Sequence, residues 1–211
     1  SATDEIELLI RARYPVLYVV TPEETRVLEA MDVIAGRRQK RIFEWTCTGG
    51  LVPQGTSIQS RQRNAATKDP LVALDHVVEQ IEPAIFVFRD FHPWLGRDNP
   101  AVIRKLKDIA IHLKNSLKTI VLVSPVVEIP VELEKEVTLV HFPLPNREEL
   151  GAVIDGIQAE LASMQRTRME LGPTGRQRMV DACLGLTRAE AENVFARLLV
   201  QHSRVTPELI G

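Results

Sequence analysis

Asp90 and Ser124 are the two side chains whose types and positions best suit chemistry on a phosphate group. Asp90 ends the segment Phe86-Val87-Phe88-Arg89-Asp90, in which a carboxylate follows an apolar run. A carboxylate at the end of such a run orients a magnesium ion in phosphoryl-transfer sites. Ser124 follows a second apolar run, residues 119–123, where a polar residue would sense a terminal phosphate. Both residues also have an ordinary use, because aspartate and serine are common in turns.

The groups that would complete such a site are missing. Residues 21–24 are Thr-Pro-Glu-Glu, whereas a phosphate-binding loop needs glycines and a lysine in that place. Neither G-x-x-x-x-G-K-[ST] nor G-x-G-x-x-G occurs in the chain, and Phe91 holds the place of the glutamate that would activate water. The sequence therefore argues against nucleotide hydrolysis by this segment. We predict no catalytic residue, no cofactor and no metal in it.

The spacing of histidine and cysteine does not indicate metal or thiol chemistry. The five histidines show no metal-ligand spacing, and His141 is expected to be a core or capping residue of a strand. Cys47 and Cys183 are far apart and neither has a histidine nearby, so we expect neither a zinc site nor a disulfide. This pattern favours a reducing, cytoplasmic compartment.

The charge balance excludes several classes of partner. The chain has 26 basic and 28 acidic residues, which leaves no positive excess for nucleic acid or an anionic membrane. We interpret the one dense basic run, residues 37–41, as a solvated helix end. No apolar run approaches the ~20 residues of a membrane span. Because the chain starts at Ser1 instead of methionine and stops at Gly211, we expect a piece of a longer protein.

The elements that must position these side chains are short apolar strands alternating with amphipathic helices. The predicted strands cover residues 16–20, 42–46, 85–88, 119–123 and 138–142. Most are apolar at successive positions, which is typical of parallel strands covered on both faces. We therefore predict an α/β fold, a three-layer sandwich with a five-stranded parallel sheet.

Three helices are predicted from a cap followed by proline, at Thr21-Pro22, Asp69-Pro70 and Asn99-Pro100. Their expected buried positions are Val27, Leu28, Met31, Ile34 and Ala35 in the first helix; Leu71, Leu74, Val78 and Ile81 in the second; and Val102, Ile103, Leu106, Ile109 and Leu113 in the third.

The pattern changes at residues 143–145, and the chain beyond them is predicted to be helical. Asn146 should cap one helix, a break should follow at Gly172-Pro173, and a further helix should cover residues 177–183. Thr187, with Glu190 in capping-box position, should open the last helix. We expect two domains, an α/β core over residues 1–145 and a small helical lid over residues 146–211.

The connection from Cys47 to Lys68 is long enough to be either functional or disordered. Residues 48–50, Thr-Gly-Gly, are predicted to turn a small hairpin. An independent enzyme of unknown class is a hypothesis that rests only on this connection.

Taken together, the segments 86–90, 119–125 and 128–150 and the stretch 185–193 resemble an AAA+ module with its helical lid. More narrowly, residues 14–21, 88–93 and 185–195 resemble the amino-terminal half of the hypothetical chloroplast reading frame forty-six family. That family occurs in plastids, cyanobacteria and other bacteria. The resemblance implies a degenerate AAA+ domain followed by an ordinary AAA+ ATPase, with ATP and magnesium bound by the parent chain. It also implies a homo-oligomer located in the cytoplasm, or in the plastid stroma for an algal protein.

Departures from the AAA+ pattern limit what the resemblance implies for single residues. Asp90 and Ser124 map onto the Walker B and sensor 1 positions as vestiges, and Lys135 stands near the place of an arginine finger. Gly49, Gly50 and Leu51 occupy the place of the pore loop without its aromatic residue. Partner-docking candidates are His92, Trp94, Gly49, Gly50 and Leu51.

We therefore expect a non-catalytic domain that serves assembly, regulation or substrate docking for a downstream AAA+ module of the same chain. The alternative is a receiver-like signalling module. In it Asp90 would accept the phosphoryl group, Glu23 and Glu24 would form the acid pair and Ser124 would be the switch hydroxyl.

Overall fold

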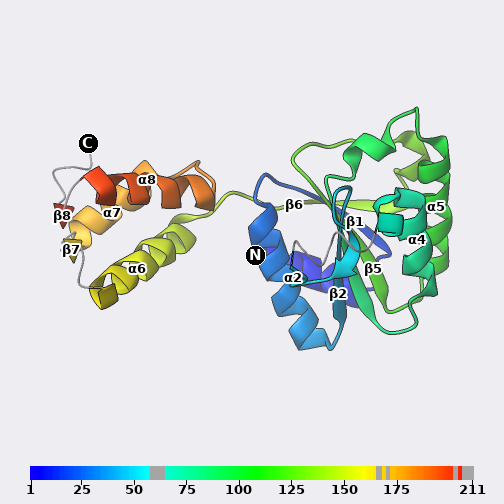
Figure 1. Ribbon diagram of the computed structural model, residues 1–211, viewed down its shortest axis with the longest axis horizontal. Helices are drawn as coiled ribbons and strands as arrows, with labels where there is room; N and C mark the ends of the chain where they lie inside the picture. Colours follow the sequence, from blue (N-terminus) through cyan, green and yellow to red (C-terminus); the bar gives the residue numbers. More distant parts are fainter. Residues whose placement is uncertain (58–64, 165–167, 170–171, 202–203, 206–211) are drawn as a thin grey trace. The chain divides into compact units, whose positions relative to one another are not determined.

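The sheet of the computed structural model contains five parallel strands and one antiparallel strand (Figure 1). The structure describes residues 1–57, 65–164, 168–169, 172–201 and 204–205. Strand order across the sheet is β3-β2-β4-β5-β1-β6. The strands are β1 Val16–Val20, β2 Arg41–Thr46, β3 Gly50–Pro53, β4 Ala84–Arg89, β5 Lys118–Ser124 and β6 Val137–His141. All five predicted parallel strands are confirmed, and the predicted hairpin is the antiparallel pair of β2 and β3.

Helices cover both faces of this sheet. Helices α1 (Ala2–Arg11) and α2 (Glu24–Arg38) lie on one face, and α4 (Pro70–Glu79) and α5 (Pro100–Leu113) lie on the other (Figure 1). Along β1, Tyr18 packs in the core under α4 and α5, whereas Leu17 and Val19 pack in the core under α1 and α2. Because successive strand residues point to opposite faces, an unbroken apolar strand fills two cores. The three-layer α/β sandwich is confirmed.

The order of the parallel strands excludes the receiver-like alternative. Strand β1 lies between β5 and β6, whereas the flavodoxin-like order places the first strand between the second and the third. Asp90 follows β4, which pairs with β2 and β5 and not with β1. The acid pair and the phospho-acceptor of a receiver therefore have no counterpart in this arrangement.

The predicted start of α2 and the predicted end of α4 were wrong, and helix α1 was not predicted. Helix α2 begins at Glu24, and Thr21 does not cap it, because the Thr21 hydroxyl accepts a hydrogen bond from the Glu23 amide at 3.0 Å. Helix α4 ends at Glu79, which leaves Ile81 96% exposed, and Val77 is buried in place of Val78. Helix α1 went unpredicted although it opens with a capping box of Ser1 and Asp4.

The predicted third helix is confirmed as α5, with all five of its expected apolar positions buried. Three short 3-10 turns accompany these elements: η1 (Ala65–Lys68) precedes α4, η2 (His92–Leu95) precedes α5, and η3 (Val131–Leu133) follows β5. His141 is exposed on the edge strand β6, so the expectation of a core or capping residue was wrong.

The chain divides into two compact units, Ser1–Phe142 and Pro143–Gly211. The second unit contains α6 (Arg147–Met164), α7 (Gly172–Ala182), α8 (Arg188–Gln201) and a short parallel pair, β7 (Arg168–Met169) and β8 (Arg204–Val205). The predicted caps are present: in the pairs Asn146–Glu149 and Thr187–Glu190, the backbone amide of each residue donates to a side-chain oxygen of the other. Helix α7 begins at Gly172, so Gly172-Pro173 opens a helix instead of separating two helices.

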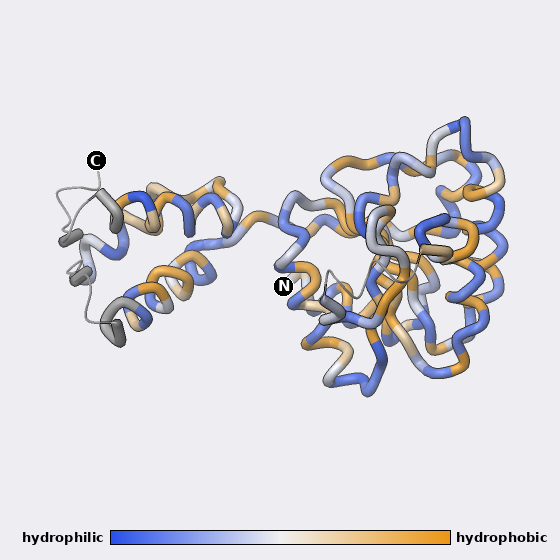
Figure 2. The backbone as a smooth tube through the Cα atoms, in the orientation of Figure 1, coloured by the Kyte–Doolittle hydropathy of each residue, from blue (hydrophilic) through white to orange (hydrophobic). Residues whose placement is uncertain are grey.

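Helices in both units are amphipathic, and Figure 2 shows hydrophobic and hydrophilic residues alternating along them. The second unit has its own apolar core, made by Leu150, Ile154, Met179, Val180, Cys183, Ala191 and Phe195. Among the helices that the structure describes, none combines the length and apolarity needed to cross a membrane.

Candidate functional site

Asp90 and Ser124 lie at the same edge of the sheet, since Asp90 directly follows β4 and Ser124 is the last residue of the adjacent strand β5. The Asp90 amide donates to the Val123 carbonyl at 2.9 Å, and the Thr21 amide donates to the Ser124 carbonyl at 2.9 Å. These bonds continue the ladders of β4 with β5 and of β5 with β1 past the last strand residues. Ligands of parallel α/β sheets bind at this edge, so the structure brings the sequence-predicted pair to the expected place.

The Ser124 hydroxyl is engaged within the protein. Its Oγ lies 2.9 Å from Nδ1 of His92, and the Val126 amide donates to the same Oγ at 3.4 Å. Ser124 is only 2% exposed. The hydroxyl thus links the end of β5 to η2, and sequence analysis did not foresee that His92 would be its partner.

Asp90 is exposed and adopts a left-handed backbone conformation, with φ of 51°. Aspartate tolerates this region better than most residues, because its short polar side chain can bond locally. The turn sends Phe91 inward, where its ring contacts Trp45 with centroids 5.3 Å apart. The backbone of Asp90 therefore makes the sharp turn by which the chain leaves β4.

The connection between β1 and α2 is three residues long and is filled by its own side chains. Glu23 is 5% exposed and its carboxylate lies 3.7 Å from the Arg26 guanidinium. Arg26 is 9% exposed, and its guanidinium stacks 5.1 Å from the centre of the Phe142 ring. A phosphate-binding loop is longer and presents backbone amides to the phosphates. Here a carboxylate occupies the start of the helix that would receive them.

Arg89 supplies a second ion pair at this edge, which sequence analysis missed. Its Nη1 lies 2.8 Å from Oε1 of Glu24 and 4.0 Å from Oε2 of Glu44, a buried residue of β2. The only sequence signal was an arginine at the end of a strand that is otherwise apolar. These contacts join β4, α2 and β2 at the carboxyl edge of the sheet.

The docking candidates divide between a partly exposed turn and the core. His92 and Trp94 belong to η2, and Trp94 packs edge-on against Trp45 at 5.2 Å. Gly50 has φ of 69° in the hairpin turn. The Leu51 side chain belongs to the sheet core, and its amide donates to the Thr67 hydroxyl at 2.9 Å. Only 8% of Leu51 is exposed at the surface.

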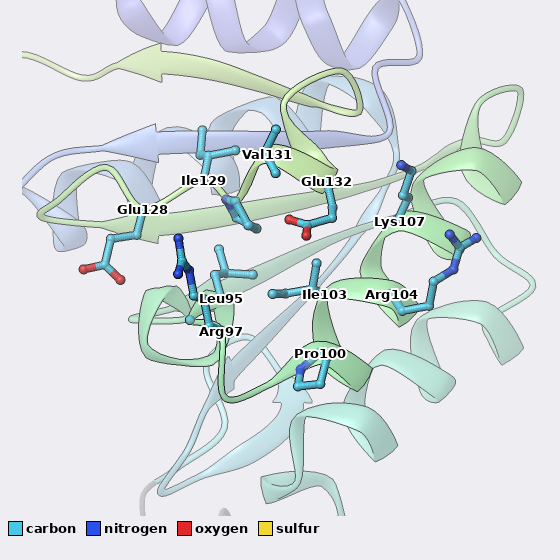
Figure 3. Close-up of a pocket in the computed structure, with 12 residues that line it drawn as sticks. Leu95, Arg97, Pro100, Ile103, Arg104, Lys107, Glu128, Ile129, Val131 and Glu132 are labelled. Atoms are coloured by element: carbon cyan, nitrogen blue, oxygen red, sulfur yellow. The ribbon is translucent and has the colours of Figure 1, made fainter.

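A groove of about 690 Å³ lies between α5 and the segment that follows β5 (Figure 3). Its apolar walls come from Leu95, Pro100, Ile103, Ile129, Pro130 and Val131. Basic residues lie along one wall and acidic residues along the other: Arg97, Arg104 and Lys107 face Glu128 and Glu132 (Figure 3). Arg104 also binds Asp108, a contact that raises the pKa of Arg104. None of the site or docking residues predicted from sequence is among the residues that line this groove.

Metal and thiol chemistry are not indicated by the described residues either. Within them no group of three or more histidine, cysteine, aspartate or glutamate side chains could hold a metal ion. Cys47 is exposed, and Cys183 is buried in the core of the second unit, where burial raises the pKa of its thiol.

Comparison with known proteins identifies relatives along nearly the whole chain. Residues 2–142 match the family described as SpoVK-like AAA ATPase, N-terminal domain, and residues 148–211 match its second domain. An uncharacterized AAA domain-containing protein ycf46 from Guillardia theta is 28% identical over 99% of this chain and 39% of its own length. The ycf46 protein of Pyropia yezoensis is 23% identical over 96% of this chain and 39% of its own length. The chain thus spans about two fifths of these relatives.

Solved structures of AAA proteins share the fold. PCH-2 of C. elegans has a TM-score of 0.62 at 11% identity, covering 99% of this chain and 64% of its own. The FIGL-1 AAA domain, solved in complex with ADP, has a TM-score of 0.58 at 12% identity, covering 90% of this chain and 62% of its own.

Proposed function

Because the chain belongs to the SpoVK-like AAA ATPases, we propose that residues 1–211 form a non-catalytic AAA domain of a larger ATPase. The domain serves the assembly, regulation or substrate docking of that ATPase. The active ATPase module lies in a part of the protein outside these residues, in keeping with relatives whose length is about two and a half times that of the matched segment.

The observation that carries this proposal is the three-residue turn between β1 and α2. A nucleotide's phosphates are normally held by backbone amides of a glycine-rich loop and by the start of the following helix. Here the turn buries the Glu23–Arg26 pair, and Glu24 opens the helix. Both carboxylates already bind arginines, Glu23 with Arg26 and Glu24 with Arg89, so internal ion pairs occupy the helix start where a phosphate would need open backbone amides.

The Arg89 ion pair supports the same conclusion. Its guanidinium lies beside Asp90 in the chain, where it binds Glu24 and approaches Glu44. The carboxylates nearest to Asp90 on these elements are thus engaged by arginine instead of being available to a magnesium ion. The residues therefore do not fit ATP or magnesium, and both belong to the parent chain's active module.

The partner of this domain is then the ATPase module of the same polypeptide, and the natural assembly is a homo-oligomer. Retention of the sheet order and of the helical second unit after loss of the phosphate loop favours a role for the surface of the domain. The working compartment is the cytoplasm, or the plastid stroma in an alga.

Calorimetric titration of the 211-residue chain with ATP and magnesium tests the proposal. No saturable binding is expected at micromolar nucleotide. Micromolar binding that requires magnesium and is lost in Asp90→Asn would overturn it, because Asp90 is the residue that would orient the metal.

A second test uses the ATPase rate of the full-length protein. Asp90→Asn should leave kcat within about twofold of the wild-type value, since a non-catalytic site contributes nothing to the transition state. Loss of the lysine of the active module's own phosphate loop is the positive control and should abolish turnover. A large fall in kcat with unchanged assembly in Asp90→Asn would contradict the proposal.

A further inference from the structure

Four cationic side chains line a small cavity at the edge of the sheet opposite to the candidate site. The cavity has a volume of about 290 Å³ and is lined by Arg11, Arg13, Arg38 and Lys40 together with Ile10, Pro83 and Leu117. No carboxylate is among these residues. Sequence analysis did not predict this cluster, because Arg11 and Arg13 are far from the basic run 37–41 along the chain.

The sheet itself brings these residues together. Lys40, Pro83 and Leu117 each directly precede a parallel strand, β2, β4 and β5, and Arg13 lies three residues before β1. These four strands are neighbours in the sheet, so the segments that enter them meet at the amino edge. Arg13 and Gln39 have left-handed backbones, with φ of 62° and 52°, which turn the chain sharply from each helix into its strand.

Two of the cations are held by backbone carbonyls instead of carboxylates. Arg13 Nη1 donates to the Asn115 carbonyl at 3.2 Å, and Lys40 Nζ donates to the Leu117 carbonyl. Burial, assisted by the nearby Arg13 guanidinium, lowers the pKa of Lys40. Each contact fixes the position of a cation and leaves its charge uncompensated.

The remaining charges do not neutralise the cluster. Glu7 binds Arg38, and it also binds Arg37 outside the cavity. The carboxyl ends of α1 and α2 contribute about half a negative charge each. Against four cations these groups leave about two positive charges at the cavity. Arg11 is an exposed residue of this lining, and no ion pair found among the described residues includes it.

We propose that this cavity binds a small phosphate-type dianion, either inorganic or carried by a small organic group. Guanidinium forks match the oxygens of phosphate, and a lysine adds a compact charge. A volume of about 290 Å³ leaves room for one or two phosphate groups. A monocarboxylate would leave part of the positive charge unmatched.

Titration of the 211-residue chain with pyrophosphate tests the site, with magnesium absent and ionic strength low. Saturable binding is expected, and backbone amide resonances of residues 11–13, 38–40 and 117 should shift. Arg11→Gln and Lys40→Gln should each weaken binding by roughly tenfold, the loss expected for one charge-assisted hydrogen bond. Lys107→Gln, in the groove between α5 and the segment after β5, is the matched control and should leave the affinity for pyrophosphate within about twofold of wild type.

Arg11→Gln removes no ion pair and should not affect folding, so a loss of binding in this variant can be assigned to the site itself. The proposal is wrong if pyrophosphate binding does not saturate, if both variants bind like wild type, or if the shifted resonances cluster at residues 21–24. Orthophosphate and glycerol 3-phosphate identify the source: tighter binding of the ester means that the ligand carries its phosphate on an organic group. Magnesium-dependent ATP binding lost in Asp90→Asn would contradict the proposed function and leave this site untouched.

Discussion

Arg89 Nη1 lies 2.8 Å from Oε1 of Glu24, and this ion pair ties the end of β4 to the first residue of α2. In a nucleotide-binding AAA domain these two elements flank the phosphates and the metal. In this chain they contact each other directly. The protein thus stabilises its own strand-end edge with internal charges.

Loss of the Arg89 cation should destabilise the first unit. Arg89→Met removes the partner of Glu24 and brings Glu44, which is 4% exposed, into a less favourable electrostatic environment. Because the pair is mostly but not fully buried, we expect a loss of about 2 kcal/mol in the free energy of unfolding. Urea unfolding measures it. Arg41→Met, whose pair with Glu82 is exposed on both sides, is the control and should cost less than about 1 kcal/mol.

Lys118 should stabilise the end of α4. Its Nζ donates to the carbonyls of Val77, Val78 and Gln80, each at 2.9 Å. Lys118→Met removes all three hydrogen bonds and should lower the free energy of unfolding by about 1 to 2 kcal/mol. Burial lowers the pKa of Lys118, so the wild-type chain bears a cost for keeping this ammonium charged. The methionine variant avoids that cost, which offsets part of the loss. Thermal unfolding measures the change. Lys114→Met removes one exposed ammonium that lies 4.0 Å from the Glu136 carboxylate, and it should cost less than about 1 kcal/mol.

Thr187 should stabilise the first turn of α8. Its hydroxyl accepts from the Glu190 amide at 3.2 Å, and its amide donates to the Glu190 carboxylate at 2.7 Å. Thr187→Ala should destabilise the second unit by about 1 kcal/mol. Hydrogen exchange should then accelerate in α8 and stay unchanged in β1 and β4, because the two units have separate cores. Thr187→Ser keeps the cap and should exchange like wild type.

Glu7 should make the first unit sensitive to acid. The Arg38 guanidinium, with Arg37, holds the pKa of Glu7 below its ordinary value of 4.5. A carboxyl whose pKa is lower in the folded chain contributes stability that is fully present above 4.5 and is lost as the pH falls through the lowered value. Glu7→Gln should therefore be less stable than wild type at neutral pH, with the difference shrinking in acid.

Urea unfolding at a series of pH values measures this difference. Glu5→Gln, at an exposed position of the same helix, is the matched control and should preserve the acid sensitivity of the wild type. An equal acid response in Glu7→Gln and wild type would show that the ion pairs of Glu7 do not link α1 to α2 energetically.

The sheet could be predicted from sequence because buried parallel strands are nearly continuous apolar runs. The runs at 16–20 and 119–123 coincide with β1 and with the interior of β5. The start of α2 could not be predicted in the same way. Thr21 has the residue type of a helix cap, but the turn uses its hydroxyl to bond Glu23, and proline follows before the helix begins. Local propensity does not reveal which of two hydrogen bonds a threonine makes.

The candidate site was predictable as a location and not as a set of contacts. Asp90 and Ser124 each stand at the end of an apolar run, so the sequence predicted that both lie at the carboxyl edge of the sheet. The contacts of Ser124 with His92 and of Arg89 with Glu24 join residues 32 and 65 positions apart, and only the folded sheet brings them together. The amino-edge cations were missed for the same reason, because Arg13 and Lys40 meet only through the strands they precede.

Strand β3 also determines how the sheet ends. It is only four residues long, and its last residue, Pro53, is paired with Phe43 and has no amide hydrogen to offer on its outer side. Short edge strands and edge prolines are what natural sheets use to prevent another chain from adding on. On this side the sheet is therefore protected against edge-to-edge aggregation, and any strand added by another molecule would have to pair with β6.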